Sequence, residues 1–416
     1  MADVAPDPGR LVARTTRLDA DLDLLTALDD GGTLFEGPDL GLAGTGTALR
    51  LALPSGPGRV AAAADVVADA LAAIAVDDEV GRPGCGPVAF CALPFDDEAP
   101  ATALVPATVL GRAADGSRWQ TTIGPAGAGA DTAPRVAGSP APGPSSFTVR
   151  PTRSPESWCA AVAEARDLVR RGALEKVVLA REVVVEGDAP FPVRDLLARL
   201  RASYPAAFRF AVDGLVGASP ELLVARAGDR VRSHPMAGTA PRSADPSTDA
   251  RLAASLLAST KDRVEHQVTI DFVLDALLPF CSYVDAEAEP SVVAMANVQH
   301  LATLVQGRLS SPPASALALA GALHPTPAVC GSPREEARAA IARLEGFDRG
   351  RYAGPVGWVD ARGDGAFAVA IRSAELEGAR ARLRAGVGVV ADSDPDAELA
   401  ESRAKLAALL GALVSP

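Results

Sequence analysis

The chain contains only three lysines, Lys176, Lys261 and Lys405, beside thirty-seven arginines. An arginine guanidinium is planar and stays protonated, whereas the compact ammonium group of lysine can lose its proton when it is buried. A chain that uses arginine for almost every cation is therefore expected to keep lysine where a guanidinium cannot do the chemistry. The four histidines also lie in the C-terminal half. The sequence thus predicts that the chemistry lies within residues 170–410.

Lys176 begins a short apolar stretch, Lys-Val-Val-Leu-Ala-Arg, which reads as a β-strand with Lys176 and Val178 on one side. A lysine that points into a partly apolar pocket can have its pKa lowered enough to act as a general base. The alternative is a strand-end lysine whose ammonium group simply reaches solvent. The scarcity of lysine in this chain favours the catalytic interpretation.

Glu221 follows a predicted turn, Gly217-Ala-Ser-Pro, and stands at the head of the next predicted strand. Burial at such a position raises the pKa of a carboxyl group, so that it can serve as a general acid. A glutamate that only caps the turn is the alternative.

Two predicted helices carry polar side chains at helical spacing, which places them on one helix face. They are Asp262, Glu265, His266 and Thr269 on the first helix, and Glu398, Glu401 and Lys405 on the second. A polar stripe of this kind is typical of a solvated face. Two such stripes would also suit a hard divalent cation such as Mg²⁺, which takes oxygen ligands and keeps several waters. Lys405 would then complement an anionic group bound through the metal.

Two glycine-containing segments could bring their backbone close to a ligand. The segment His234-Pro-Met-Ala-Gly-Thr has the composition of a tight loop, and Ala385-Gly-Val-Gly-Val-Val could offer backbone N–H groups to a carboxylate. An ordinary surface turn explains the first segment equally well, and a glycine pair is a weak signal.

These residues must be positioned by elements that the sequence predicts in both halves of the chain. Residues 1–150 are expected to serve as a scaffold, with a flexible loop or linker at about 124–146, and residues 151–416 carry the motifs. Ser154 and Asp394 are predicted N-caps because each precedes a proline and a helical pattern. Helices are predicted at 154–171, within 246–278, at 333–344 and at 394–413. Strands are predicted at 176–186 and within 292–308, and a three-stranded meander at 356–359, 366–372 and 382–390.

Composition limits the class of protein. With 416 residues, 48% of them hydrophobic, the chain can form one large or two ordinary domains. The formal net charge of −12 argues against nucleic acid or an anionic membrane surface as the main partner. The sequence contains neither an apolar run long enough to span a membrane nor an N-terminal signal pattern. Five cysteines without metal-binding spacing fit a reducing compartment, so we expect a cytoplasmic protein.

Taken in order, the segments from about Pro155 to the C-terminus resemble the chorismate-utilising enzymes. The resemblance implies an α+β fold, with residues 1–416 in a single large domain of two packed, mainly antiparallel β-sheets flanked by helices. The stretch 124–146 is then a loop within that domain. The motifs that carry the resemblance are Lys176-Val-Val-Leu-Ala-Arg, Ala218-Ser-Pro-Glu-Leu-Leu, Pro235-Met-Ala-Gly-Thr, Ser259-Thr-Lys-Asp-Arg-Val-Glu-His, Val298-Gln-His-Leu-Ala-Thr, Leu323-His-Pro-Thr-Pro-Ala-Val-Cys-Gly, Glu345-Gly-Phe-Asp-Arg-Gly-Arg-Tyr-Ala-Gly, Ala368-Val-Ala-Ile-Arg and Ala391-Asp-Ser-Asp-Pro-Asp-Ala-Glu.

Within that family, the chain is most similar to the isochorismate synthases. These enzymes and the salicylate synthases carry a lysine at the position of Lys176 as the base that activates water, and anthranilate synthases lack it there. Aminodeoxychorismate synthases carry a nucleophilic lysine where this chain has Ala237. Ala328 matches the small residue of isochorismate synthases. The resemblance implies conversion of chorismate to isochorismate, with a salicylate synthase or a non-catalytic chorismate-binding subunit as alternatives.

The resemblance also implies individual roles. Lys176 would remove a proton from the water that attacks ring C2, and Glu221 would protonate the departing C4 hydroxyl. Mg²⁺, bound to the ring carboxylate of chorismate, would be held by Glu265 and Glu401, with Glu398 nearby through water. The residues implied to contact chorismate are Gly238, Thr239, His300, Thr303, Ala328, Tyr352, Ile371, Arg372, Gly386, Gly388 and Lys405. Among them, Arg372 and the Gly386–Gly388 backbone would hold the enolpyruvyl carboxylate. No nucleic acid or membrane partner is implied, and a monomer or weak homo-oligomer is expected.

Three positions depart from the family pattern. Ala240 stands where relatives often carry arginine, Ala366 where they usually carry glutamate, and Val387 where alanine is usual. None of the three removes a catalytic group, but Val387 is expected to add bulk beside the carboxylate site. The sequence leaves open whether the product serves menaquinone, siderophore or salicylate synthesis.

Overall fold

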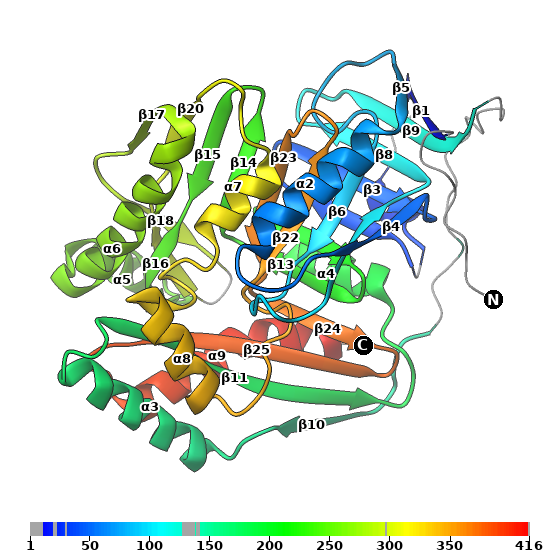
Figure 1. The fold of residues 1–416 in the computed structure, drawn as a ribbon. Helices are drawn as coiled ribbons and strands as arrows, with labels where there is room; N and C mark the ends of the chain where they lie inside the picture. Colours follow the sequence, from blue (N-terminus) through cyan, green and yellow to red (C-terminus); the bar gives the residue numbers. More distant parts are fainter. Residues whose placement is uncertain are drawn as a thin grey trace.

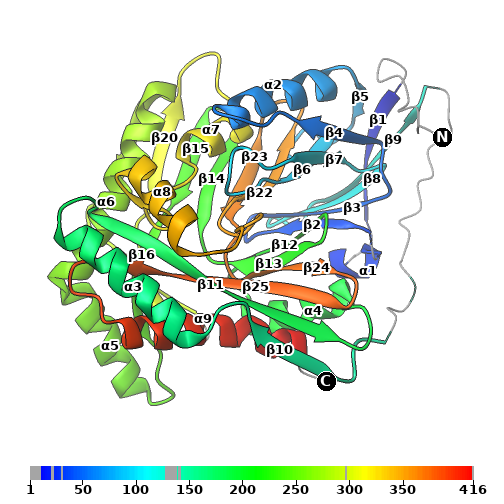
Figure 2. The same cartoon turned by 60° about the horizontal axis from the view of Figure 1, so that its bottom comes forward.

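The computed structural model describes residues 11–19, 23–29, 31–126, 138, 142–295 and 298–414. Mainly antiparallel β-sheets and the helices that cover them form an α+β fold, as Figures 1 and 2 show. The predicted fold class is confirmed, with a third, small sheet added to the two large ones. The predicted loop at 124–146 lies mostly outside the described residues.

The largest sheet combines strands from both halves of the chain, so the division near residue 150 is not a division of the sheet. Within the described residues it has thirteen strands, and all of the pairings but β1 with β5 are antiparallel. In spatial order they are β10 (Phe147–Pro151), β11 (Lys176–Gly187), β25 (Arg380–Val389), β24 (Ser373–Glu377), β13 (Leu215–Ser219), β12 (Phe208–Val212), β2 (Thr33–Glu36), β3 (Leu40–Thr45), β8 (Thr108–Ala113), β9 (Arg118–Pro125), β1 (Leu11–Arg17) and β5 (Ala75–Asp78), with β21 (Gly331–Ser332) paired to β11.

The second large sheet also combines strands from both halves of the chain, and a short third sheet accompanies it. The nine strands of the second sheet, in the described part of the chain, are β17 (Cys281–Ala286), β20 (Val305–Leu309), β15 (Arg230–His234), β14 (Leu222–Ala227), β23 (Gly365–Val369), β22 (Pro355–Asp360), β6 (Val88–Ala92), β7 (Ala101–Val105) and β4 (Leu49–Leu53). The short sheet contains β16 (Met236–Pro241), β19 (Val298–Ala302) and β18 (Ser291–Ala294).

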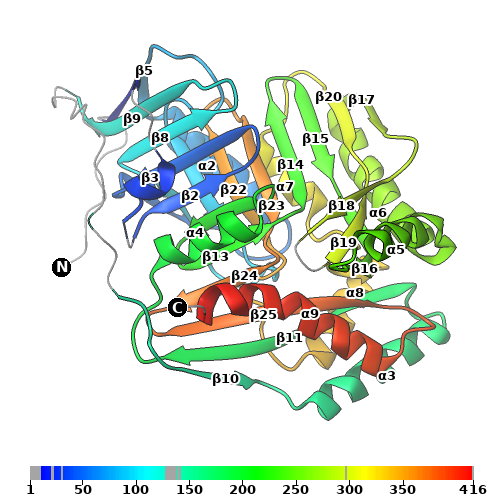
Figure 3. The ribbon, with the colours of Figure 1, turned by 180° about the vertical axis from the view of Figure 1, so that it is seen from behind.

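The helices cover the sheets in separate groups. They are α1 (Leu24–Ala27), α2 (Arg59–Ala72), α3 (Pro155–Arg170), α4 (Val193–Ser203), α5 (Pro246–Ala258), α6 (Thr260–Leu277), α7 (Ala316–Leu323), α8 (Arg334–Leu344) and α9 (Pro395–Val414), with a 3₁₀ turn at Leu278–Phe280. Helices α2 and α7 pack against each other over the nine-stranded sheet. Helices α3, α8 and α9 lie against β11 and β25 (Figure 3). Helix α6 contacts β16 of the short sheet and β17 of the second.

Local capping signals explain where several helices begin. The Ser154 side chain accepts a hydrogen bond from the backbone N–H of Ser157, and the Asp394 carboxylate accepts from the backbone of Ala397, so both predicted N-caps are present. The long helix predicted within 246–278 is present as α6, and the separate helix α5 precedes it. Ser259 ends α5 and caps α6, because its hydroxyl accepts from the N–H of Asp262.

The predicted three-stranded meander at 356–390 is wrong in its pairing. Strands β22 and β23 do pair in the nine-stranded sheet. The chain then leaves that sheet near Arg372, whose φ of 52° lies in the left-handed region. The strand β24 was not predicted, and it pairs with β25 in the thirteen-stranded sheet. The chain between β23 and β24 thus links the two large sheets.

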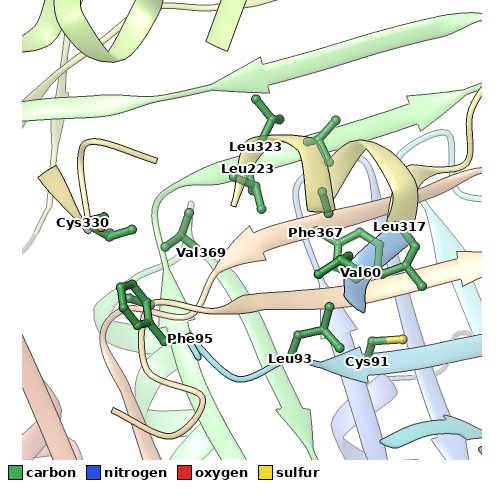
Figure 4. Close-up of a cluster of buried hydrophobic side chains, with 14 of the residues drawn as sticks. Val60, Cys91, Leu93, Phe95, Leu223, Leu317, Leu323, Cys330, Phe367 and Val369 are labelled. Atoms are coloured by element: carbon green, nitrogen blue, oxygen red, sulfur yellow. The ribbon is translucent and has the colours of Figure 1, made fainter. Parts of the chain in front are cut away.

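The largest hydrophobic core joins the second sheet, α2 and α7 to the region of β11. Figure 4 shows part of it, with Val60 from α2, Leu317 and Leu323 from α7, and Phe367 and Val369 from β23. The same cluster includes Phe95 and Cys330 (Figure 4). The core therefore extends to the loop that follows β6 and to the loop that precedes β21, and the second of these contributes to the candidate site.

Candidate active site

A cavity of about 300 Å³ lies where β11 and β25 meet α6, α9 and the short sheet. All three lysines of the chain line it. The residues given a role from the sequence that line the cavity are Lys176, Glu221, Gly238, Thr239, Glu265, His300, Ala328, Tyr352, Ile371, Arg372, Gly386, Gly388, Glu398, Glu401 and Lys405. The structure thus brings together residues from ten separate segments, while their individual roles remain predictions.

Thr303 is the exception, because it does not line the cavity. It is completely buried, and its hydroxyl is 2.8 Å from Nε2 of His266. The polar stripe on α6 divides accordingly: Asp262 and Glu265 line the cavity, whereas His266 and Thr269 are buried outside it. Burial lowers the pKa of His266 to about 4, so this histidine is neutral at physiological pH.

Lys176 is the first residue of β11, and its Nζ donates to Oε1 of Glu265 at 2.6 Å. Only 7% of the lysine is exposed. Strand β25 makes room for its stem with a glycine, since a Cβ at Gly388 would lie 2.8 Å from the Lys176 Cε. Burial opposes ionisation of Glu265, but the charges of Lys176, Lys405 and Lys261 outweigh it and hold its pKa below the usual value. In this structure Lys176 and Glu265 are therefore an ion pair.

Glu221 lies in the turn between β13 and β14, where Pro220 precedes it. The residue is only 3% exposed. Burial raises the pKa of its carboxyl group to about 7, although a backbone hydrogen bond from Met236 and the charges of Lys176 and Arg372 oppose the increase. A carboxyl group with this pKa is partly protonated near neutral pH, as a general acid must be.

The acidic end of the cavity contains Glu398 and Glu401 of α9, together with Glu265. Lys405 Nζ is 2.6 Å from Glu401 Oε1 and donates to the Gly386 carbonyl at 3.0 Å. Burial, with the negative charge of Glu401, raises the pKa of Glu398 to about 7. In the described residues no three His, Cys, Asp or Glu side chains are gathered closely enough to form a metal-ligand set. In the structure Lys176 and Lys405 each hold one of these carboxylates.

The cationic end of the cavity is formed by Arg372. Its side chain is 8% exposed, and within the described part of the chain its Nη2 is buried without a hydrogen-bond partner. A buried, unpaired guanidinium N–H is costly, so this group is suited to an anion that enters the cavity. Tyr352 lies beside it, with a hydroxyl that accepts from the Gly386 backbone. A Cβ at Gly386 would lie 3.1 Å from that hydroxyl, so glycine leaves space here.

His300 of β19 is fixed by the loop that contains Gly238. Its Nδ1 is 3.1 Å from the carbonyl oxygen of Gly238 and 3.1 Å from the hydroxyl of Thr239. Burial lowers the pKa of His300 to about 3, so the ring is neutral. Because a carbonyl only accepts, Nδ1 must carry the proton, and Nε2 is left as an acceptor. Gly238 itself has φ of 74°, which favours glycine at this bulge.

Sequence reasoning left several lining residues without a role. Lys261 and Asp262 had been singled out by residue type but had not been assigned a function, and both line the cavity. Val178 also lines it, as the alternation of β11 from Lys176 indicates. The expectation for Val387 was wrong: it is fully buried in the main core. Strand alternation turns Val387 away from the face that Gly386 and Gly388 present to the cavity.

The fold and the cavity define a class of protein. A family model for chorismate binding enzymes matches residues 132–414, and the chain belongs to this family. The putative isochorismate synthase MenF of Mycobacterium tuberculosis is 45% identical over 348 residues, which cover 80% of this chain and 88% of that protein. The isochorismate synthase DhbC of Bacillus subtilis is 40% identical over 338 residues, which cover 79% of this chain and 81% of that protein.

Solved structures agree with these sequence relatives. A putative 2,3-dihydroxybenzoate-specific isochorismate synthase, DhbC from Bacillus anthracis, superposes with a TM-score of 0.78 at 34% identity, covering 94% of this chain and 98% of that chain. Anthranilate synthase component I from Streptococcus pneumoniae has a TM-score of 0.72 at 22% identity over 89% of this chain and 92% of that chain, which is a likeness of fold alone. In the residues that the structure describes, no helix has the length and apolar character needed to span a bilayer.

Proposed function

We propose that this chain is an isochorismate synthase that converts chorismate to isochorismate with Mg²⁺ as its cofactor. The observation on which the proposal rests is that one cavity contains both a candidate general acid and a candidate general base. Glu221 supplies a buried carboxyl group with a pKa of about 7, and Lys176 supplies an amine from strand β11. Ala237 lines the same cavity and supplies no nucleophile, which leaves water for that role.

Chorismate is a dicarboxylate, and two parts of the cavity suit its two charges. The unpaired Nη2 of Arg372 would bind the enolpyruvyl carboxylate, with the backbone of Gly386 and Gly388 alongside. Tyr352 would pack near the pyruvyl group, and Nε2 of His300 would accept a hydrogen bond from the C4 hydroxyl. These contacts would position the ring before the reaction, and such positioning must supply much of the rate enhancement.

The reaction needs one proton removed and one proton supplied. Lys176 would take a proton from water as the water oxygen bonds to ring C2. The ring double bonds would shift, the C4–O bond would break, and Glu221 would give its proton to the departing hydroxyl, which leaves as water. Addition and loss of water balance, so the product is an isomer. For this role Lys176 must release Glu265, to which it donates in the structure, and must first lose one proton, because an ammonium group cannot accept another.

The acidic residues fit a hard divalent cation. Their donor atoms are carboxylate oxygens. Burial is the main cause of the raised pKa of Glu398, and repulsion by Glu401, which a cation would relieve, adds to it. Glu265, Glu398 and Glu401 would hold Mg²⁺. When bound, the cation would neutralise and anchor the ring carboxylate of chorismate.

Product analysis tests the proposal. Purified protein would be incubated with chorismate and Mg²⁺, with and without a chelator, and the products would be separated by liquid chromatography. Isochorismate in equilibrium with chorismate, lost with chelator and restored by excess Mg²⁺, is the expected result. Salicylate with an equal amount of pyruvate would instead identify a salicylate synthase. Absence of turnover would refute the enzymatic proposal and favour a chorismate-binding subunit.

The setting of the enzyme is part of the proposal. The five cysteines, Cys85, Cys91, Cys159, Cys281 and Cys330, are free thiols, which fits the reducing conditions of a cytoplasmic protein. We expect a monomer or weak homo-oligomer, which light scattering of the purified protein would test.

A further inference from the structure

A buried ion pair lies directly behind the cavity, outside the residues with proposed roles. Glu345 follows the end of α8, and Arg349 lies four residues further along the chain, beyond the helix. The two residues are 2% and 3% exposed. The Arg349 Nε is 2.9 Å from Glu345 Oε2, and its Nη2 is 2.5 Å from Oε1. Two opposite charges are thus fully desolvated with a forked geometry.

The pair also bonds the outer edge of β11. That edge pairs with β21 only at Lys176 and Val177, and β10 begins to pair at Val183. Between these contacts, the Arg349 Nη2 donates to the Val178 carbonyl at 2.8 Å, and Glu345 Oε1 accepts from the N–H of Ala180 at 2.7 Å. The two side chains therefore supply part of the hydrogen bonding that a neighbouring strand would provide. The Cys330 carbonyl and the Trp158 indole N–H bond the other groups of Val178 and Ala180.

Another donor of Arg349 reaches the segment that precedes β21, which lies beside β11. Its Nη1 donates to the Val329 carbonyl at 2.8 Å, in the segment that contains Ala328. The guanidinium carbon lies 4.3 Å from the centre of the Phe95 ring and 5.9 Å from that of Tyr352. Val178, Val329 and Tyr352 all line the cavity. One guanidinium thus contacts three separate parts of the cavity wall.

A buried ion pair gives little net stability, because desolvation offsets most of the attraction, and apolar replacement is often neutral. The distinctive property of the pair is its geometry. The planar arginine guanidinium points its N–H groups in fixed directions, and this fixes the distances between the groups that accept from it. We propose that Glu345 and Arg349 are positioning residues. They hold β11, which carries Lys176 and Val178, in a fixed position relative to the Ala328–Val329 segment and Tyr352. The inference rests on the proposed function for its catalytic consequence.

The test compares two double variants of the full-length enzyme. Glu345→Met with Arg349→Met removes the pair without leaving a buried charge. The matched control is Glu36→Met with Arg209→Met, a pair whose members are 2% and 6% exposed and whose arginine also donates to backbone carbonyls. The control pair joins β2 to β12 and the segment before it. Glu36 also accepts a hydrogen bond from Arg112 of β8, whose side chain is partly exposed. Neither Glu36 nor Arg209 lines the cavity.

Steady-state kinetics and melting temperature would be measured for both variants. We expect kcat for chorismate to fall about 10–100-fold in the Glu345/Arg349 variant, since misplacement by about 1 Å can cost that much. We expect KM to change less than kcat, and the melting temperature to fall no further than in the control. A kcat within about threefold of the parent, or an equal loss of kcat in both variants, would overturn the proposal.

Two further measurements keep the test decisive. Arg349→Lys retains the charge and is expected to fold, but a single ammonium group cannot reproduce the fork; full kcat in this variant would refute the proposal even where the double variant does not fold. Hydrogen exchange of peptides covering 176–182 and 324–332 reports positioning without any reaction. We expect faster exchange there than in the parent and the control, and unchanged exchange would refute the proposal. If the parent does not convert chorismate, the proposed function fails, and the exchange result still decides the positioning role.

Discussion

Replacement of Glu221 by glutamine should make the protein more stable at alkaline pH while abolishing most of its activity. Burial raises the pKa of Glu221 from 4.5 to about 7. The folded carboxyl group therefore binds its proton more tightly than the unfolded one. The stability that it contributes is fully present below pH 4.5 and is lost as the pH rises through 7.

The magnitude follows from the two pKa values. The difference between 4.5 and about 7 corresponds to roughly 3 kcal/mol in the free energy of unfolding. Glutamine is neutral throughout this range, so its burial does not lose stability as the pH rises. We expect the stability of Glu221→Gln relative to the parent to be roughly 2–3 kcal/mol greater at pH 8 than at pH 5. Glutamine cannot supply a proton, so activity should fall by about 10²–10⁴-fold.

Urea unfolding of both proteins at pH 5 and pH 8, in the presence of a chelator, would measure the effect, with chorismate turnover measured in parallel. Glu398 also has a pKa of about 7, but it is present in both proteins and cancels in the comparison. An equal stability difference at the two pH values would show that Glu221 does not titrate in this range. Turnover within tenfold of the parent would refute its role as the acid.

Four other substitutions test the remaining parts of the site. Lys176→Arg should keep a cation beside Glu265 but remove the base, so chorismate turnover should be lost while the circular dichroism spectrum is unchanged; retained turnover would contradict the base assignment. Gly388→Ala places a Cβ 2.8 Å from the Lys176 side chain and should reduce kcat about 10–100-fold, whereas Gly411→Ala meets no atom within 4 Å and should leave kcat unchanged. Arg372→Gln should raise KM for chorismate more than it lowers kcat, because it removes an unpaired cation from the cavity; an unchanged KM would argue against carboxylate binding. Glu265→Gln should weaken Mg²⁺ binding measured by calorimetry, and unaltered binding would exclude Glu265 as a ligand.

The sequence by itself was sufficient to predict several local elements and most of the residues that line the cavity. Proline after a capping residue was sufficient to predict the start of α3 at Ser154 and of α9 at Asp394. Alternation of apolar residues was sufficient to predict β11. These signals act over a few residues, so they can be read without the fold. The rarity of lysine was informative in another way, since all three lysines line one cavity.

Only the tertiary structure decided what these residues contact and how strongly each holds its proton. The bond of Thr303 to His266, the transfer of β24 and β25 to the other sheet, and the unpaired Nη2 of Arg372 all depend on segments that are distant in the chain. The Glu345–Arg349 pair has the spacing of an ordinary helix-surface ion pair, i to i+4, but both side chains are buried. Burial and hydrogen-bond partners arise from packing of the whole chain. The pKa of Glu221 and the proposed positioning role of Arg349 could therefore not be read from the sequence.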